Sequence, residues 1–266
     1  MNSSEDIQCF KVEDLKLISR YKVLKISYFQ EFLGKYVRQC FNAGGTVYYS
    51  LNRRNEITGI LIMNEEEGEG AIFVNETESL SVLASRAGNI AMFSEINLPI
   101  RGDKYLIMES DLSETSNLTS FGNSVETLKK SGLPNLMDCI NAIYPRTRIN
   151  SIKASLDDGD ICFVVRAGES IVGFAFVSIS GNIGRLPLFG VLPEFRGLGI
   201  GSDLVRARIL FLRQIGLKKV FSEIKESNSE SMRISQKFGF RKAGVIWLYF
   251  PESGSWSATV RTLGKS

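Results

Sequence analysis

The sequence predicts an α+β (α/β) fold in which helices flank a mixed, mostly antiparallel sheet. Short apolar runs bounded by turn residues are typical of strands. Other segments repeat apolar residues every three or four positions, as helices that cover a sheet do. The length of 266 residues fits two domains of ordinary size better than one.

The elements expected in the C-terminal half follow in this order: helices over 135–144 and 148–156, strands over 161–166, 171–178 and 183–192, a helix beginning near 202, a strand over 219–224, a helix over 229–238, and a closing hairpin of 245–250 with 257–263. Pro145 separates the first two helices, and Ala167–Ser170 is the expected hairpin turn between the first two strands. The closing hairpin turns at Glu252–Gly254.

The N-terminal half repeats the early part of this order. We expect strands over 46–51, 57–63 and 71–74 and a helix from about 79. Ile57-Thr58-Gly59 parallels Ile171-Val172-Gly173 in the later hairpin. The stretch 115–133, rich in Ser, Thr, Asn and Gly, contains the expected linker between the two halves.

The segment Arg196-Gly197-Leu198-Gly199-Ile200-Gly201 lies between an apolar strand and an amphipathic helix. Glycine lets the backbone approach a ligand closely, because it has no Cβ atom. At a strand-to-helix turn, successive N–H groups point into one concavity, and the helix N-terminus adds partial positive charge. This glycine loop therefore predicts a phosphate site. The alternative is a tight turn that needs glycine only for its shape.

Two common phosphate loops do not fit this segment. A Walker loop needs lysine and then serine or threonine after its last glycine, whereas serine and aspartate follow Gly201. The dinucleotide-binding motif G-x-G-x-x-G, if it began at Gly197, would require glycine at the position of Ser202. If it began at Gly199, it would require glycine at the position of Leu204. The glycine loop thus belongs to another class of phosphate binder.

The loop resembles the acyl-coenzyme A signature R/Q-x-x-G-x-G/A of the GNAT N-acetyltransferase superfamily. Arg196, Gly199 and Gly201 occupy its fixed positions. The second signature of that superfamily, an asparagine leading into a helix that ends in Gly-Phe, is matched by Asn228, Ser231, Ile234, Lys237, Gly239 and Phe240. The resemblance covers residues 135–266 and implies a GNAT acetyltransferase domain that uses acetyl-CoA as co-substrate and no metal.

The resemblance assigns cofactor binding to Phe189, Gly190, Val191, Arg196, Gly197, Leu198, Gly199, Ile200, Gly201, Ser202, Asn228 and Ser231. The strand end at 189–191 would bond the pantetheine arm in sheet fashion, and one of its N–H groups would stabilise the oxyanion. Gly190 marks either a bulge or a packing contact under a helix. Arg196 would contact phosphate or buttress the loop. Asn228 would bond the pantetheine amides, cap the next helix, or do both.

An amine acceptor must lose a proton before it attacks, because an ammonium group has a pKa of about 10.4. Glu223 is the candidate base, at the spacing before Asn228 that acetyltransferases of protein N-termini show. The alternative is that Glu223 pairs with Lys225 on the same strand face. Many family members have a tyrosine acid where this chain has Ser235. Tyr249 is the nearest other hydroxyl, and its alternative role is packing against Trp247.

In the N-terminal half, the acidic segment Asn75–Ser79 stands where a glycine loop would fall, and its carboxylates would repel a pyrophosphate. We therefore expect residues 1–120 to form a degenerate GNAT-like domain without a CoA loop, followed by the GNAT acetyltransferase domain at 135–266. The alternative is an unrelated α+β domain. The sequence leaves open whether this half lines the acceptor cleft or forms a homodimer interface.

Composition excludes several function classes. The chain contains no histidine, which removes Ser-His-Asp and Cys-His mechanisms and most zinc sites. The net charge of +3, without a run of basic residues, does not favour binding of nucleic acid. A single basic face that spans both halves would favour it. No secretory signal heads the chain and no apolar run has membrane-spanning length. The scattered Cys9, Cys40, Cys139 and Cys162 predict reduced thiols and a cytoplasmic protein.

These patterns together predict an acyl-CoA-dependent N-acetyltransferase. It would move an acetyl group from acetyl-CoA to a protein N-terminus, a lysine or a small-molecule amine by direct attack on the thioester. The alternative is a non-catalytic acyl-CoA-binding or regulatory protein, which would keep the glycine loop but transfer nothing.

Overall fold

The structure, a computed structural model, describes residues 8–12, 27–42, 44–64, 69–74, 76–84, 86–87, 90–98, 100–113, 118, 122–145, 147, 149–251 and 256. It divides into two units. Unit 1 contains residues 1–105 and 244–266, and unit 2 contains residues 106–243. These bounds differ from the expected domains, because the C-terminal segment belongs to unit 1 and not to the unit of the glycine loop. The α+β class with a mostly antiparallel sheet is confirmed.

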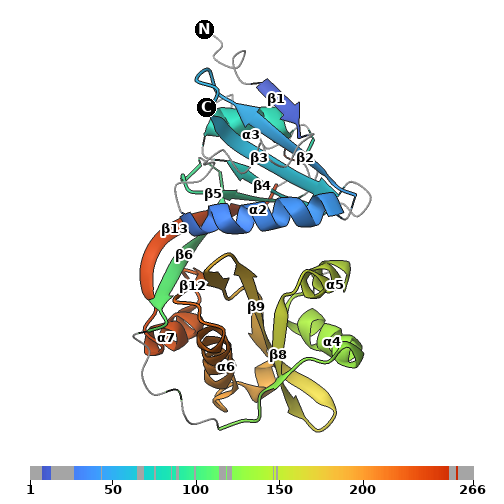
Figure 1. Ribbon diagram of the computed structural model, residues 1–266, viewed down its shortest axis with the longest axis vertical. Helices are drawn as coiled ribbons and strands as arrows, with labels where there is room; N and C mark the ends of the chain where they lie inside the picture. Colours follow the sequence, from blue (N-terminus) through green and yellow to red (C-terminus); the bar gives the residue numbers. More distant parts are fainter. Residues whose placement is uncertain are drawn as a thin grey trace. The chain divides into compact units, whose positions relative to one another are not determined.

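Unit 2 has a sheet with helices on both faces. Its strands are β7 (Glu126–Thr127), β8 (Ile161–Ala167), β9 (Ser170–Ser180), β10 (Ile183–Arg185), β11 (Phe189–Val191) and β12 (Lys219–Lys225). β7, β8, β9 and β10 pair in this order, each antiparallel to the next, and β10 pairs with β12 in parallel. Figure 1 shows α6 (Ile200–Gln214) and α7 (Ser229–Lys237) on one side of β8 and β9, and α4 (Leu133–Ile143) and α5 (Ile149–Asp157) on the other. Short 3₁₀ turns lie at Lys130–Gly132 and Pro193–Phe195.

The long strand expected over 183–192 is two strands that pair differently. β10 pairs with both β9 and β12, and the last main-chain bond toward β12 runs from the N–H of Leu186 to the carbonyl of Phe221, 2.8 Å. Pro187 follows and has no N–H to continue the ladder. β11 then pairs with β9, antiparallel. β11 and β12 therefore separate beyond Leu186, and among the described residues no strand pairs with the other edge of β11.

The helices of unit 2 bury the apolar faces that their sequences predict. α6 packs Leu204, Ile209 and Leu212 into one core, together with strand residues such as Val220 and Ile224. α4 packs Leu136 and Ile140 into a second core, with Phe174 and Phe176 of β9. Each fully buried side chain of this size contributes about 1.5–3 kcal/mol relative to exposure. The two cores fix the sheet between the helix layers and hold β11 in place.

Unit 1 has its own sheet. Its strands are β1 (Gln8–Lys11), β2 (Thr46–Leu51), β3 (Ile57–Asn64), β4 (Glu69–Val74), β5 (Ala91–Ser94) and the end of β13 (Arg241–Tyr249). β1 to β4 pair antiparallel in order, β4 pairs with β5 in parallel, and Trp247–Tyr249 pair antiparallel with β5. Figure 1 shows α2 (Ser27–Asn42) in front of these strands and α3 (Thr77–Ala84) behind them. β6 (Gly102–Asp111) carries the chain from unit 1 into unit 2.

The paired Ile-x-Gly segments have the same role in the two units. A Cβ atom built on Gly173 of β9 would lie 2.8 Å from Ile200 Cγ2 of α6. One built on Gly59 of β3 would lie 2.9 Å from Leu83 Cδ1 of α3. In each case glycine lets a helix, α6 in unit 2 and α3 in unit 1, approach the sheet closely. The second strand of the expected closing hairpin, 257–263, lies outside the described residues.

All four cysteines are free thiols, as the sequence predicts. Burial raises the pKa of Cys139 from 9.0 to about 11 and the pKa of Cys162 from 9.0 to about 12. Both thiols therefore stay neutral at pH values where they ionise in the unfolded chain. Their contribution to stability is complete below pH 9.0 and is lost as the pH rises through 9.0 toward the folded values.

We expect the free energy of unfolding to fall between pH 8 and pH 10.5 in urea titrations, with part of that slope caused by these two thiols. A Cys139→Ala, Cys162→Ala double variant should be less stable at pH 8, because it leaves cavities, but its stability should fall less steeply with pH. An equal slope in the two proteins would show that the buried thiols do not contribute.

Candidate functional site

A pocket of ≈ 370 Å³ lies over the glycine loop, with its lining residues all in unit 2. It is lined by Ile143, Tyr144, Phe189, Gly190, Val191, Phe195, Arg196, Gly197, Gly199, Ile200, Gly201, Ser202, Asn228, Glu230, Ser231, Arg233 and Ile234. Every residue predicted to bind the cofactor is among them except Leu198, which is 62% exposed. The structure thus brings the two sequence motifs together around one cavity.

The glycines of the loop are required for two different reasons. Gly197 and Gly199 have φ angles of 79° and 83°, in the left-handed region that other residues rarely adopt. Gly201 lies in the first turn of α6, where a Cβ atom would lie 3.2 Å from both Ile234 Cδ1 and Phe189 Cζ. Gly199 is the N-cap of α6 and no side chain caps that end. The first turn of α6 is therefore suited to an anionic ligand.

The edge of β11 faces the pocket. The carbonyl of Leu188 accepts from the N–H of Phe176, and the N–H of Leu192 donates to the carbonyl of Val172, so 188 and 192 point toward β9. Alternate residues of a strand direct their main-chain groups to opposite edges. The N–H and C=O groups of residues 189 and 191 consequently point away from β9, along the side where an extended ligand can add as a further strand.

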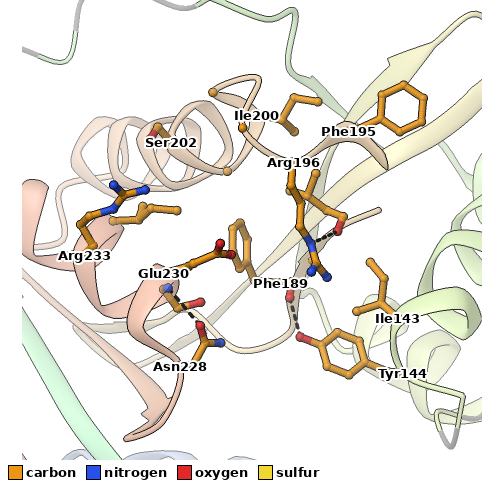
Figure 2. Close-up of a pocket in the computed structure, with 17 residues that line it drawn as sticks. Ile143, Tyr144, Phe189, Phe195, Arg196, Ile200, Ser202, Asn228, Glu230 and Arg233 are labelled. Carbon is orange, nitrogen blue, oxygen red and sulfur yellow. Dashed lines mark hydrogen bonds between the residues drawn. The ribbon is translucent and has the colours of Figure 1, made fainter. Parts of the chain in front are cut away.

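Two side chains reach the carbonyls on this edge. The hydroxyl of Tyr144 donates to the carbonyl of Phe189 at 2.7 Å, and Nε of Arg196 donates to the carbonyl of Val191 at 3.3 Å (Figure 2). Arg196 also lines the pocket, so both of its expected roles, phosphate contact and support of the loop, are compatible with its position. The Arg208 guanidinium of α6 lies 5.2 Å from the centre of the Phe189 ring, and this cation–π contact connects β11 to α6.

Of the two roles expected for Gly190, the structure shows close packing against a helix and not a β-bulge. A Cβ atom there would lie 2.8 Å from Ile143 Cδ1 and 3.1 Å from the Phe174 ring. β11 pairs with β9 in continuous register through this residue. Glycine is therefore needed because α4 and Phe174 occupy the space on that side.

α7 closes the pocket opposite Arg196. The Oδ1 atom of Asn228 accepts from the N–H of Ser231 at 3.1 Å, so Asn228 caps α7 while it lines the pocket. Figure 2 shows Ser202, Glu230 and Arg233 on one side of the cavity and Arg196, Ile143 and Tyr144 on the other.

Three polar residues of the pocket, Tyr144, Glu230 and Arg233, are absent from the sequence-based site. Glu230 and Arg233 could have been found, because they stand three residues apart on the expected helix 229–238, beside Asn228. No comparable local signal identifies Tyr144, which reaches the site because α4 ends next to β11.

Glu223, the predicted base, forms an ion pair on β12. Nε of Arg185 donates to its two carboxylate oxygens at 2.9 and 3.1 Å. The two side chains are 18% and 12% exposed. Glu223 lies on the face of β12 opposite to the core residues Val220 and Ile224. At this point β12 has separated from β11. Glu223 is not among the residues that line the pocket. Its catalytic role remains a prediction.

Tyr249, the predicted acid, belongs to unit 1. Its hydroxyl accepts from the N–H of Leu98 at 2.8 Å, and its ring stacks on Trp247 with centroids 6.4 Å apart. Burial raises the pKa of Tyr249, which makes its hydroxyl a weaker acid than a free tyrosine. Ser235, at the position of the family tyrosine, is buried on α7 and outside the pocket lining.

We expect Tyr249→Phe to lower the free energy of unfolding by about 1–2 kcal/mol, because the buried N–H of Leu98 loses its acceptor. The affinity for acetyl-CoA should stay unchanged. Urea titration and calorimetric binding measure the two effects. A large fall in the turnover rate with no loss of stability would instead support the acid role predicted from the sequence.

No group of three or more cysteine, aspartate or glutamate side chains is placed to hold a metal ion in the part of the chain that the structure describes. Among the helices within the described ranges, none is long and apolar enough to cross a membrane.

The glycine-loop segment is similar to a known protein family. The family described as "Acetyltransferase (GNAT) family" matches residues 134–240. The N-alpha-acetyltransferase RimI of Mycobacterium tuberculosis is 32% identical over 103 residues, which are 36% of this chain and 61% of that protein. The mycothiol acetyltransferase of Thermobispora bispora is 31% identical over 94 residues, 33% of this chain and 32% of that protein. The chain thus spans less than two thirds of these relatives.

The structural comparison covers more of the chain. A solved structure described as a tandem GNAT protein from the clavulanic acid biosynthesis pathway superposes with a TM-score of 0.61 over 92% of this chain and 98% of that one, at 11% identity. At this identity the likeness concerns the fold.

Proposed function

We propose that residues 134–240, which match the acetyltransferase (GNAT) family, form an acetyltransferase domain and that the protein is an acyl-CoA-dependent N-acetyltransferase. The donor is acetyl-CoA and the acceptor is an amine of a protein N-terminus, a lysine or a small molecule. One observation carries the proposal: the uncapped first turn of α6 and the open edge of β11 line the same pocket. The pyrophosphate and the pantetheine arm of acetyl-CoA need these two surfaces together.

The proposed chemistry is a direct transfer. The amine nitrogen attacks the thioester carbon, and the carbonyl electron pair moves to oxygen, where an N–H group of β11 at 189 stabilises the charge. After the attack the nitrogen carries a positive charge and loses a second proton to solvent. The carbonyl then re-forms, the C–S bond breaks, and CoA leaves as a thiolate. Glu223 accepts the proton that the ammonium group must lose, through a water molecule, and Arg185 holds its carboxylate in position. Solvent protonates the thiolate, so a tyrosine at 235 is not required.

A thiol-release assay tests the proposal. The purified protein is mixed with acetyl-CoA and a panel of amines that includes α-amino peptides, lysine peptides and small polyamines, and free CoA thiol is measured together with the mass of the acceptor. We expect acetylated amine and thiol in equal amounts. The relative named an N-alpha-acetyltransferase supports α-amino peptides as the first acceptors in the panel.

The second candidate is a non-catalytic acyl-CoA-binding protein, which the absence of a tyrosine at Ser235 favours. Calorimetric titration with acetyl-CoA separates the two candidates. Tight binding with no transfer to any amine in the panel would support the second. Absence of binding would exclude both.

A further inference from the structure

The carboxylate of Asp203 is buried beside the glycine loop, in the first turn of α6. Its side chain belongs to a residue only 3% exposed, and its Oδ1 atom pairs with Nη1 of Arg206. Its Oδ2 atom accepts hydrogen bonds from the N–H groups of Gly122 and Asn123, at 3.2 and 2.8 Å, and from Nδ2 of Asn123 at 2.9 Å. Asp203 therefore fastens a segment from far upstream in the sequence to the start of α6.

Asn123 makes a second contact, with the glycine loop itself. Its Nδ2 atom donates to the carbonyl of Leu198 at 3.1 Å. An amide NH₂ group has two hydrogens, so one reaches Leu198 and the other reaches Asp203. A Cβ atom on Gly199 would lie 3.8 Å from the same nitrogen, which places Asn123 directly behind the loop.

The direction of the Leu198 carbonyl determines the direction of the next N–H. In a trans peptide the carbonyl of one residue and the N–H of the following residue point in opposite directions. Because the Leu198 carbonyl points toward Asn123, which is outside the pocket lining, the N–H of Gly199 points away from Asn123. Gly199 lines the pocket, whereas Leu198 does not.

We propose that Asn123 is a positioning residue for the pyrophosphate site. It fixes the peptide between Leu198 and Gly199 so that the Gly199 N–H faces the ligand, and Asp203 fixes Asn123. The glycine loop is flexible by composition, and this contact removes part of that freedom before the ligand binds. The inference rests on the proposed function, since it concerns how the same pocket recognises CoA.

The test compares two ligands, of which only one contains the pyrophosphate. Calorimetry measures the Kd for CoA, and ligand-observed NMR measures the Kd for pantetheine, which lacks the entire 3′-phosphorylated ADP part of CoA. For Asn123→Ala we expect the Kd for CoA to rise roughly tenfold and the Kd for pantetheine to stay within about twofold, because only the phosphate contacts are affected. In the transfer assay the KM for acetyl-CoA should rise while kcat is kept.

Two further variants control for folding. Asn135 makes the same type of bond elsewhere in unit 2, from its Nδ2 atom to the carbonyl of Glu169 at 3.1 Å, and lies outside the pocket lining. Asn135→Ala should leave both Kd values unchanged. Asn123→Asp keeps the side-chain size, removes the donor and places a second carboxylate beside Asp203, so its loss of CoA affinity should at least equal that of Asn123→Ala.

Each outcome decides between distinct conclusions. Wild-type affinity for CoA in both Asn123 variants would overturn the inference, and so would an equal loss for CoA and pantetheine, which a general loosening of the fold produces. Failure of the wild-type protein itself to bind CoA would overturn the proposed function instead.

Discussion

Gly199→Val is expected to weaken the binding of CoA on the order of 100-fold, because the loop must leave its native conformation. Gly199 has a φ angle of 83°, where a β-branched residue is strongly disfavoured. The strain is relieved only by rotating peptides of the loop, and these peptides carry the N–H groups that face the pocket. Calorimetric titration with CoA measures the loss, and circular dichroism shows whether the variant is folded.

Gly216→Val is the matched control for this prediction. Gly216 has a φ angle of 85°, follows α6 at its other end, and has no other atoms within 4 Å of a Cβ built on it. The backbone strain is therefore the same, but the residue is outside the pocket lining. Both variants should melt at lower temperature, and only Gly199→Val should lose CoA affinity. Equal CoA affinities in the two variants would contradict a role of the loop in binding.

Glu223→Gln should lower kcat by about 100- to 10,000-fold, the range expected when a general base is removed. Glutamine has nearly the size of glutamate and its carbonyl oxygen can still accept from Arg185, so the fold and the Kd for acetyl-CoA should be kept. Steady-state rates with saturating amine and acetyl-CoA measure the effect. The decrease should be largest near neutral pH, where an amine acceptor is almost fully protonated.

Glu126→Gln provides the comparison. Glu126 also pairs with an arginine Nε, that of Arg166 at 2.6 Å, in the same unit and outside the pocket lining. Loss of this pair should leave kcat unchanged. If Glu223→Gln binds acetyl-CoA normally and transfers at the rate of Glu126→Gln, then Glu223 is not the base, and its pair with Arg185 serves the structure of β12.

The glycine loop and the Asn228 motif are the parts of the site that local sequence predicts best. Each is a short segment whose chemistry depends on its own backbone: positive φ at Gly197 and Gly199, and a helix cap at Asn228. Local sequence also predicts the amphipathic helices around the pocket. Their observed bounds differ from the expected ones by one or two residues.

Local sequence patterns do not predict features that depend on residues far away in the chain. The division of 183–192 into β10 and β11 follows from a change of partner strand at Pro187, and the position of Tyr249 follows from pairing with β5, more than a hundred residues earlier. Asn123, in the expected linker, has no motif that connects it to the glycine loop. By contrast α2 is missing from the predicted elements although Phe32, Leu33 and Val37 are spaced for one buried helical face.

The division of unit 1 into two sequence segments has a consequence for biosynthesis. Residues 106–243 form unit 2 and are synthesised as one uninterrupted stretch, whereas unit 1 needs residues from both sides of it. The end of β13 pairs with β5, and the buried indole of Trp256 donates to the carbonyl of Ile90 at 2.7 Å. On the ribosome, unit 2 therefore has its full set of residues before unit 1 does. Until residues 247–256 emerge, β5 has an unpaired strand edge, the kind of surface that a nascent chain must keep from pairing with other chains.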